Sequence, residues 1–166
     1  ITAALALAAC ATATPYQPLR GSSGGFVEQR IDANRYRVTF VGNDYTSRQR
    51  VENYLLYRAA ELTVANGFDG FTLIDHDTDR NVEHRVYDTG LRSSYYSGWR
   101  PNWRYYGGPY GWRSWDPWNG GPYWGDNFDV QTVERYEAMA EIQMFRGRAV
   151  GATSFDARQI IANLQP

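Results

Sequence analysis

The 166-residue chain contains no lysine, so all 17 of its basic residues are arginine, and it contains a single cysteine. One thiol cannot form an internal disulfide, which excludes a disulfide-stabilised fold. The formal net charge of −1 gives no reason to expect nucleic acid as a partner. Residues 1–9 are apolar or small, but they are too few to span a bilayer, which takes about 20 apolar residues.

The start of the chain resembles an export signal. Residues 1–9 carry no charge, and we expect them to be a signal-peptide remnant whose positively charged beginning is missing. Residues 7–10 are Leu-Ala-Ala-Cys, which resembles the lipobox of bacterial lipoproteins. The resemblance implies that Cys10 becomes the first residue and carries diacylglycerol and an N-acyl chain. The alternative is a secreted protein with a free thiol.

The lipobox resemblance also implies an address. Two or more acyl chains anchor a protein stably to a membrane. Residue 11 is alanine rather than aspartate, which in the sorting rule of enteric bacteria implies the outer membrane. We therefore expect a lipid-anchored protein of the cell envelope that faces the periplasm.

Residues 10–25 are rich in alanine, threonine, proline, serine and glycine, and this composition predicts a flexible tether. Residues 21–25 match the G-x-S-x-G pattern of a hydrolase nucleophile elbow. That motif requires a preceding strand and a following helix, and the sequence predicts neither. No other constellation suggests catalysis, so we expect a protein that is not an enzyme.

Residues 26–166 are predicted to form one small α+β domain whose order begins near Arg35. Alternation predicts a strand at 36–40, and a short, mostly apolar run predicts a buried strand at 71–75. Between them, a capping box at Thr46 and Gln49 predicts the start of a helix. One apolar stripe supports this helix, formed by Val51, Leu55, Ala59 and Leu62 and widened by Leu56, Ala60 and Thr63.

Residues 132–145 contain good helix formers but also alternate in polarity, and we predict a strand there. Ser154 is predicted to cap a final helix. The order β-α-β-β-(aromatic insert)-β-α predicts a two-layer sandwich, in which two helices cover one face of an antiparallel sheet. On the first helix, Arg58 and Glu61 have the spacing of a surface ion pair.

Three segments resemble a family of small proteobacterial lipoproteins. They are YRVTF at 36–40, NYLLYRAAELT at 53–63 and FDAR at 155–158, and the similarity covers most of the chain after Cys10 except the aromatic insert. That family has no assigned activity or catalytic residues, so the resemblance carries no function over to this chain.

Acidic and imidazole side chains are close together in the sequence around a predicted hairpin at residues 71–86. Asp75, Asp77, His76 and His84 could bind Zn²⁺ or another divalent ion. Arginine replaces the glycine that a calcium loop needs at position 80. The alternative, which we favour, is a polar hairpin with cross-strand charge pairs and no metal.

Residues 93–127 form an aromatic insert without any alanine, valine, isoleucine, leucine or methionine, so we expect the core to lack tryptophan. Exposed rings could stack on cell-wall glycan, lie at the lipid headgroup layer or drive self-association through stacking and cation–π pairs. An envelope protein is a further possible partner, and the insert could instead be a loop without a ligand. Our hypothesis is a non-enzymatic structural or accessory lipoprotein, with a surface-binding module as the alternative. The candidate binding surface comprises Trp99, Trp103, Trp112, Trp115, Trp118 and Trp124.

Overall fold

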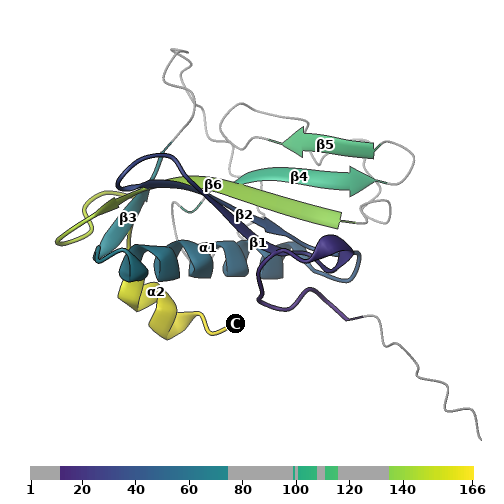
Figure 1. Cartoon of the computed structure of the whole chain (residues 1–166), viewed down its shortest axis with the longest axis horizontal. Helices are drawn as coiled ribbons and strands as arrows, with labels where there is room; N and C mark the ends of the chain where they lie inside the picture. Colours follow the sequence, from purple (N-terminus) through teal and green to yellow (C-terminus); the bar gives the residue numbers. More distant parts are fainter. Residues whose placement is uncertain (1–11, 75–98, 100, 108–110, 116–134) are drawn as a thin grey trace, which may run out of the picture.

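The computed structural model describes residues 12–74, 99, 101–107, 111–115 and 135–166, with 102–107 and 111–115 described by their backbone. A β-sheet forms one layer, and helices α1 and α2 form the other (Figure 1). The elements in chain order are η1 (Gly21–Ser23), β1 (Gly25–Arg30), β2 (Arg35–Val41), α1 (Arg48–Ala65), β3 (Gly70–Leu73), β4 (Asn102–Gly107), β5 (Gly111–Trp115), β6 (Arg135–Phe145), β7 (Ser154–Asp156) and α2 (Ala157–Asn163).

Strand β6 is the centre of the sheet. Five strands lie in the order β1-β2-β6-β3-β7, all paired antiparallel. β2 follows one edge of β6, while the other edge is shared between β3, which pairs with residues 142–145, and β4, which pairs with residues 135–139. β5 is joined to the sheet through β4. This arrangement confirms the predicted α+β sandwich, and residues 135–145 form a strand as predicted.

The core lies between the sheet and α1. All seven positions of the predicted helix stripe are buried, and they face buried side chains of β2 and β6 such as Val38, Phe40 and Ile142. Because valine and isoleucine are stiff and fit a pleated surface, β2 and β6 present a well-defined apolar face to the helix. The predicted burial of the α1 stripe is therefore confirmed.

Both predicted helix caps are wrong by one or two residues. The Oγ of Ser47, not of Thr46, accepts the hydrogen bond from the Arg50 backbone N–H at 3.3 Å. At α2 the cap is Asp156, whose Oδ1 accepts from the Gln159 N–H at 2.9 Å. Ser154 instead belongs to β7. Several residue types can cap a helix, so neighbouring candidates are separated only by tertiary contacts.

The chain becomes ordered before Arg35, in contrast to the prediction. Strand β1 pairs with β2 from Gly25 to Arg30. Residues 12–25, predicted to be a flexible tether, pack against the domain through contacts described below. Long-range hydrogen bonds fix this segment, although its composition is that of a linker.

Trp99 corrects the expectation of a core without tryptophan. Its side chain is only 2% exposed. Its ring lies edge-on to Phe71 at a centroid distance of 6.1 Å and to Phe155 at 5.8 Å. The insert also contributes strands β4 and β5 to the sheet. Part of the insert is thus integral to the domain.

Shortening the centre of the α1 stripe should destabilise the whole domain. Leu55 is fully buried, so Leu55→Ala should lower the free energy of unfolding by about 2–5 kcal/mol. Chemical denaturation followed by circular dichroism measures this change. The control Val150→Ala, at a side chain that is 79% exposed, should change stability by less than about 0.5 kcal/mol. Equal effects of the two substitutions would contradict the placement of α1.

Trp99→Ala should also destabilise the domain, by about 3–5 kcal/mol, because it leaves a cavity between two phenylalanine rings. For the same reason, replacing residues 93–127 by a short glycine-serine connector should reduce stability, because Trp99 and two strands are lost. The midpoint of thermal unfolding measures both changes. An unchanged unfolding midpoint in the connector variant would show that the insert contributes nothing to the stability of the domain.

Candidate functional site

The segment that follows Cys10 is joined to the loop between β2 and α1. Thr14 is completely buried. Its backbone N–H donates to Thr46 Oγ1 at 2.8 Å, and its own Oγ1 accepts from the Asn43 N–H at 2.8 Å. Asn43 Nδ2 donates to the carbonyl oxygen of Thr12 at 2.8 Å. These bonds hold the first described residues against one end of the domain.

The glycine-rich stretch at residues 21–25 serves this close packing. Gly24 has a φ of +80°, and a Cβ atom there would lie 2.3 Å from the Val41 carbonyl oxygen and 2.8 Å from Thr14 Oγ1. Only glycine fits such an approach. Residues 21–23 form a short 3₁₀-helix that leads into a strand. The strand-turn-helix context of a nucleophile elbow is therefore absent here.

Tyr16 anchors the same segment in an aromatic cluster on α1 and β1. Its ring centroid lies 5.0 Å from that of Phe26, 5.5 Å from Tyr54 and 5.1 Å from Tyr57. Tilted and edge-to-face pairs of this kind contribute about 0.5–1.5 kcal/mol each beyond their burial. The cluster explains why a segment with few aliphatic residues nevertheless packs.

Arg58 sits between two carboxylates at the edge of this cluster. It forms ion pairs with Glu28 on β1 and, at 2.9 Å, with Glu61 on α1, and its guanidinium lies 4.2 Å from the centre of the Phe26 ring. The Tyr16 hydroxyl donates a hydrogen bond to Glu61. The predicted ion pair between Arg58 and Glu61 is confirmed, and it is one part of a network that joins the N-terminal segment, β1 and α1.

The network changes the acid–base properties of its members. Burial, together with the hydrogen bond and charge of Glu61, raises the pKa of the Tyr16 hydroxyl far above its ordinary value near 10. Burial lowers the pKa of Arg58, but the hydrogen bonds to Glu28 and Glu61 outweigh it and the pKa is raised overall. A protonated tyrosine and a charged arginine at neutral pH form structural links rather than an acid–base pair.

A second charged cluster lies on the opposite face of the sheet. The side chain of Glu141 on β6 is only 2% exposed and lies 3.1 Å from Arg35 and 3.4 Å from Arg37, both on β2. A buried carboxylate needs such partners, since leaving it unpaired would cost several kcal/mol. The alternating sequence pattern predicted that Glu141 lies on the polar face of the strand, but it did not predict that this side chain is buried.

The structure describes some of the predicted site residues and not others. Trp99 is a core residue, while Trp103, Trp112 and Trp115 lie in β4 and β5, joined to β6. The other residues that the sequence singled out lie outside the described part of the chain, and the predictions for them are unchanged. They are Cys10, Asp75, His76, Asp77, His84, Trp118 and Trp124.

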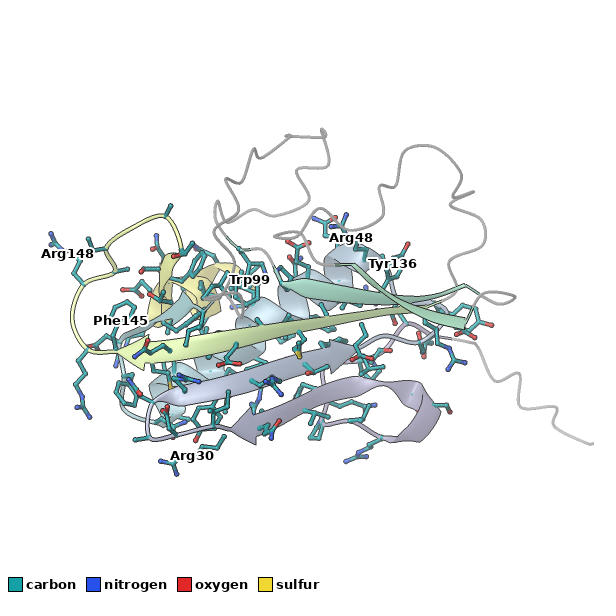
Figure 2. The ribbon with its side chains drawn as sticks, turned by 90° about the horizontal axis from the view of Figure 1, so that it is seen from above. Arg30, Arg48, Trp99, Tyr136, Phe145 and Arg148 are labelled. Carbon is teal, nitrogen blue, oxygen red and sulfur yellow. The ribbon has the colours of Figure 1, made fainter. Side chains whose placement is uncertain are left out.

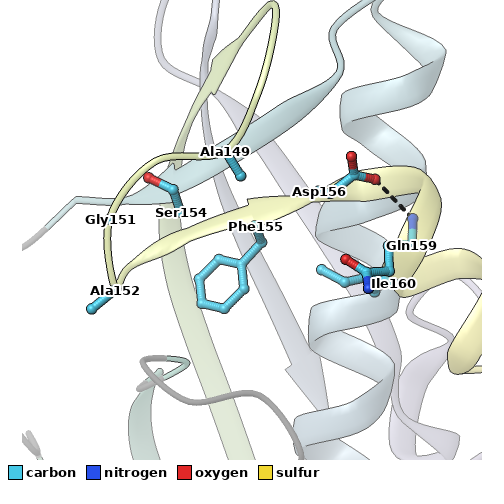
Figure 3. Close-up of a pocket in the computed structure, with 8 residues that line it drawn as sticks. All are labelled: Ala149, Gly151, Ala152, Ser154, Phe155, Asp156, Gln159 and Ile160. Carbon is cyan, nitrogen blue, oxygen red and sulfur yellow. Dashed lines mark hydrogen bonds between the residues drawn. The ribbon is translucent and has the colours of Figure 1, made fainter.

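The described surface is hollowed at two shallow places. One, of about 320 Å³, lies beside β7 and α2 and is lined by residues such as Phe155, Gln159 and Ile160 (Figure 3). The other, of about 370 Å³, lies between α1 and the residues after α2. Within the described ranges there is no group of three or more histidine, cysteine or acidic side chains that could hold a metal ion. The first hollow is lined by Ser154 and Asp156, but the Ser154 hydroxyl is hydrogen-bonded to the Thr72 hydroxyl at 2.6 Å and Asp156 Oδ1 accepts from the Gln159 N–H at 2.9 Å.

Comparison with known proteins gives no match to a family model, to a curated protein or to a solved structure. Among the described residues, no helix combines the length and apolar character that crossing a membrane requires.

Removing the Tyr16 hydroxyl should lower the free energy of unfolding at neutral pH. It should also make that free energy fall less steeply as the pH rises above the ordinary tyrosine pKa. Tyr16→Phe keeps the ring but loses the hydrogen bond to Glu61, at a cost of about 1–3 kcal/mol. Because the folded-state pKa of Tyr16 is raised, its contribution is fully present below pH 10, the ordinary tyrosine value, and is lost as pH rises above it.

Urea denaturation at a series of values from about pH 8 to about pH 12 checks this prediction. Above pH 10 the unfolding free energy should fall more steeply for the wild type than for Tyr16→Phe. Burial also raises the pKa values of Tyr57 and Tyr136, but these residues are present in both proteins and cancel in the difference. Parallel curves would contradict the assigned role of Tyr16.

Proposed function

We propose that this chain is a lipid-anchored protein of the bacterial envelope, in which Cys10 carries diacylglycerol and an N-acyl chain. The small α+β domain has a structural or accessory role without catalysis. With alanine at residue 11, the destination is the outer membrane, with the domain on the periplasmic side.

The observation that carries this proposal is the position of the single thiol. Cys10 ends an apolar segment in a lipobox pattern and precedes by two residues Thr12, whose carbonyl oxygen is already bound by Asn43. The buried apolar residues of the described core begin at Val38. A thiol at this place in the chain suits modification by an envelope enzyme.

The non-enzymatic role is supported by what the described polar clusters do. The Arg58 network joins three chain segments, and the Glu141 cluster joins β2 to β6. Each charged group in them has a partner of opposite charge: Arg58 pairs with Glu28 on β1 and with Glu61 on its own helix, and Glu141 on β6 pairs with Arg35 and Arg37 on β2. Such arrangements stabilise a fold, whereas a catalytic group has to face its substrate.

Contact with a surface is the second candidate function. The backbone of the aromatic insert enters the sheet through β4, and β5 lies beyond it. Three of the six tryptophan positions therefore lie in strands of the sheet, which favours a surface carried by the sheet over a loop without a ligand.

Substituting the thiol tests the anchoring directly. Cys10→Ser, expressed with a complete signal peptide, should take up no radiolabelled palmitate and should accumulate as uncleaved or soluble protein, because the hydroxyl cannot replace the thiol as lipid acceptor. The control Ser23→Ala changes the serine of the G-x-S-x-G pattern and should be labelled as strongly as the wild type. Palmitate label in the Cys10→Ser protein would contradict the assignment of residues 7–10 as a lipobox.

A further inference from the structure

The N-terminal segment leaves the domain at a defined end of the sheet. Thr12 and Thr14 are bound by Asn43 and Thr46, in the loop that follows β2. The next loop residue, Asp44, forms an ion pair with Arg135, the first residue of β6. In Figure 1 this end, where β6 begins and β4 finishes, lies at the right, beside the described start of the chain. We call it the exit end.

The exit end is too close to Cys10 for a spacer between the lipid and the fold. Cα atoms of successive residues are about 3.8 Å apart, so the two steps from Cys10 to Thr12 cover at most about 7.6 Å. The headgroup layer on each side of a bilayer is itself about 5–8 Å thick. With acyl chains on Cys10, the exit end must therefore touch or almost touch the headgroups.

Aromatic positions gather at the same end. Tyr45, in the loop after β2, is 62% exposed. By strand register, Tyr106 pairs with Arg135 on one side and with Trp112 on the other. These two ring-bearing positions thus lie level with the start of β6. Tyrosine and tryptophan are enriched at membrane interfaces because their rings are amphipathic.

One exposed arginine at this end suits contact with a lipid surface. Arg50 is exposed in the first turn of α1. Positive charge is unfavourable at a helix N-terminus, where the helix dipole is itself positive, so this arginine does not serve the stability of the helix. Lipid phosphates at the headgroup layer would complement it.

The opposite end of the domain is too far from Cys10 to contact the membrane at the same time. β6 is 11 residues long, and at about 3.4 Å per residue it separates the two ends by roughly 34 Å. Figure 2 shows Tyr136 and Arg48 at the exit end and Phe145 and Arg148 at the other. The exposed Val150 belongs to that far end, out of reach of a lipid on Cys10.

We propose that the exit end, formed by residues 43–50, the start of β6 and the adjoining ends of β4 and β5, docks on the bilayer surface. Tyr45 and Arg50 then lie at the headgroup layer, and the far end points away from the membrane. The proposal rests on the lipidation of Cys10. It adds an orientation and a second, non-covalent contact with the membrane.

The test uses the lipidated full chain in vesicles of phosphatidylethanolamine and phosphatidylglycerol. A single added cysteine, at Tyr45→Cys or Arg50→Cys, carries an environment-sensitive fluorophore, and Val150→Cys is the matched exposed control. Because lipidation consumes the thiol of Cys10, the wild type should take up no label. Lipids with a nitroxide in the headgroup region then quench fluorophores at the membrane surface.

The fluorophores at positions 45 and 50 should lose most of their emission and shift to shorter wavelength, while that at 150 should be unchanged. Thermal unfolding midpoints equal to that of the wild type show that each variant is folded. Equal quenching at all three positions, or quenching at 150 alone, would overturn the orientation. An absence of quenching at positions 45 and 50 would also overturn the docking proposal. The same holds if the protein pellets with isolated cell wall and shows no quenching in vesicles.

The two proposals fail in distinguishable ways. If Cys10 is not lipidated, the wild type takes up fluorophore and incorporates no palmitate, and the proposed function fails. If palmitate is incorporated but positions 45 and 50 are not quenched, anchoring holds and only the docking proposal is wrong.

Discussion

Within the described part of the chain, every other strand is joined to the backbone of β6, either directly or through one neighbouring strand. β2 occupies one edge, β3 and β4 divide the other, and β1, β7 and β5 attach to these three. Its buried face packs on α1, and its other face holds Glu141 between two arginines. Because β6 comes late in the chain, the earlier strands complete their pairing only when it is in place, a non-local order that slows folding.

The packing of residues 12–25 has the largest consequence for function. Buried Thr14, the Gly24 approach and the Tyr16 cluster turn a linker-like composition into part of the fold. Under the proposal that Cys10 carries lipid, a flexible tether would let the domain reach distant partners, whereas a packed segment would hold the domain close to the membrane. The contacts of residues 12–25 contribute to stability, and under that proposal they would also restrict where the protein can act.

The sequence predicted those elements whose side chains repeat with the period of a helix or a strand. The α1 stripe and the alternation in β6 follow from side-chain periodicity, and both were correct. Thr14, by contrast, is ordered by Thr46, 32 residues away in sequence. Trp99 is buried by Phe71 and Phe155, and no local pattern distinguishes it from the five other tryptophans. β7 has only three residues, too few to show a period. The Arg58–Glu61 pair was predicted from its spacing, but its links to Tyr16 and Glu28 required the fold.

Neutron reflectometry of the lipidated protein on a supported bilayer tests the central claim, that a fold beginning two residues after Cys10 holds the domain against the membrane. The account predicts protein density that starts directly at the headgroup layer, with no hydrated gap between them. A water-filled gap between headgroups and protein, of the kind that a flexible tether of 16 residues from 10 to 25 would give, would contradict it.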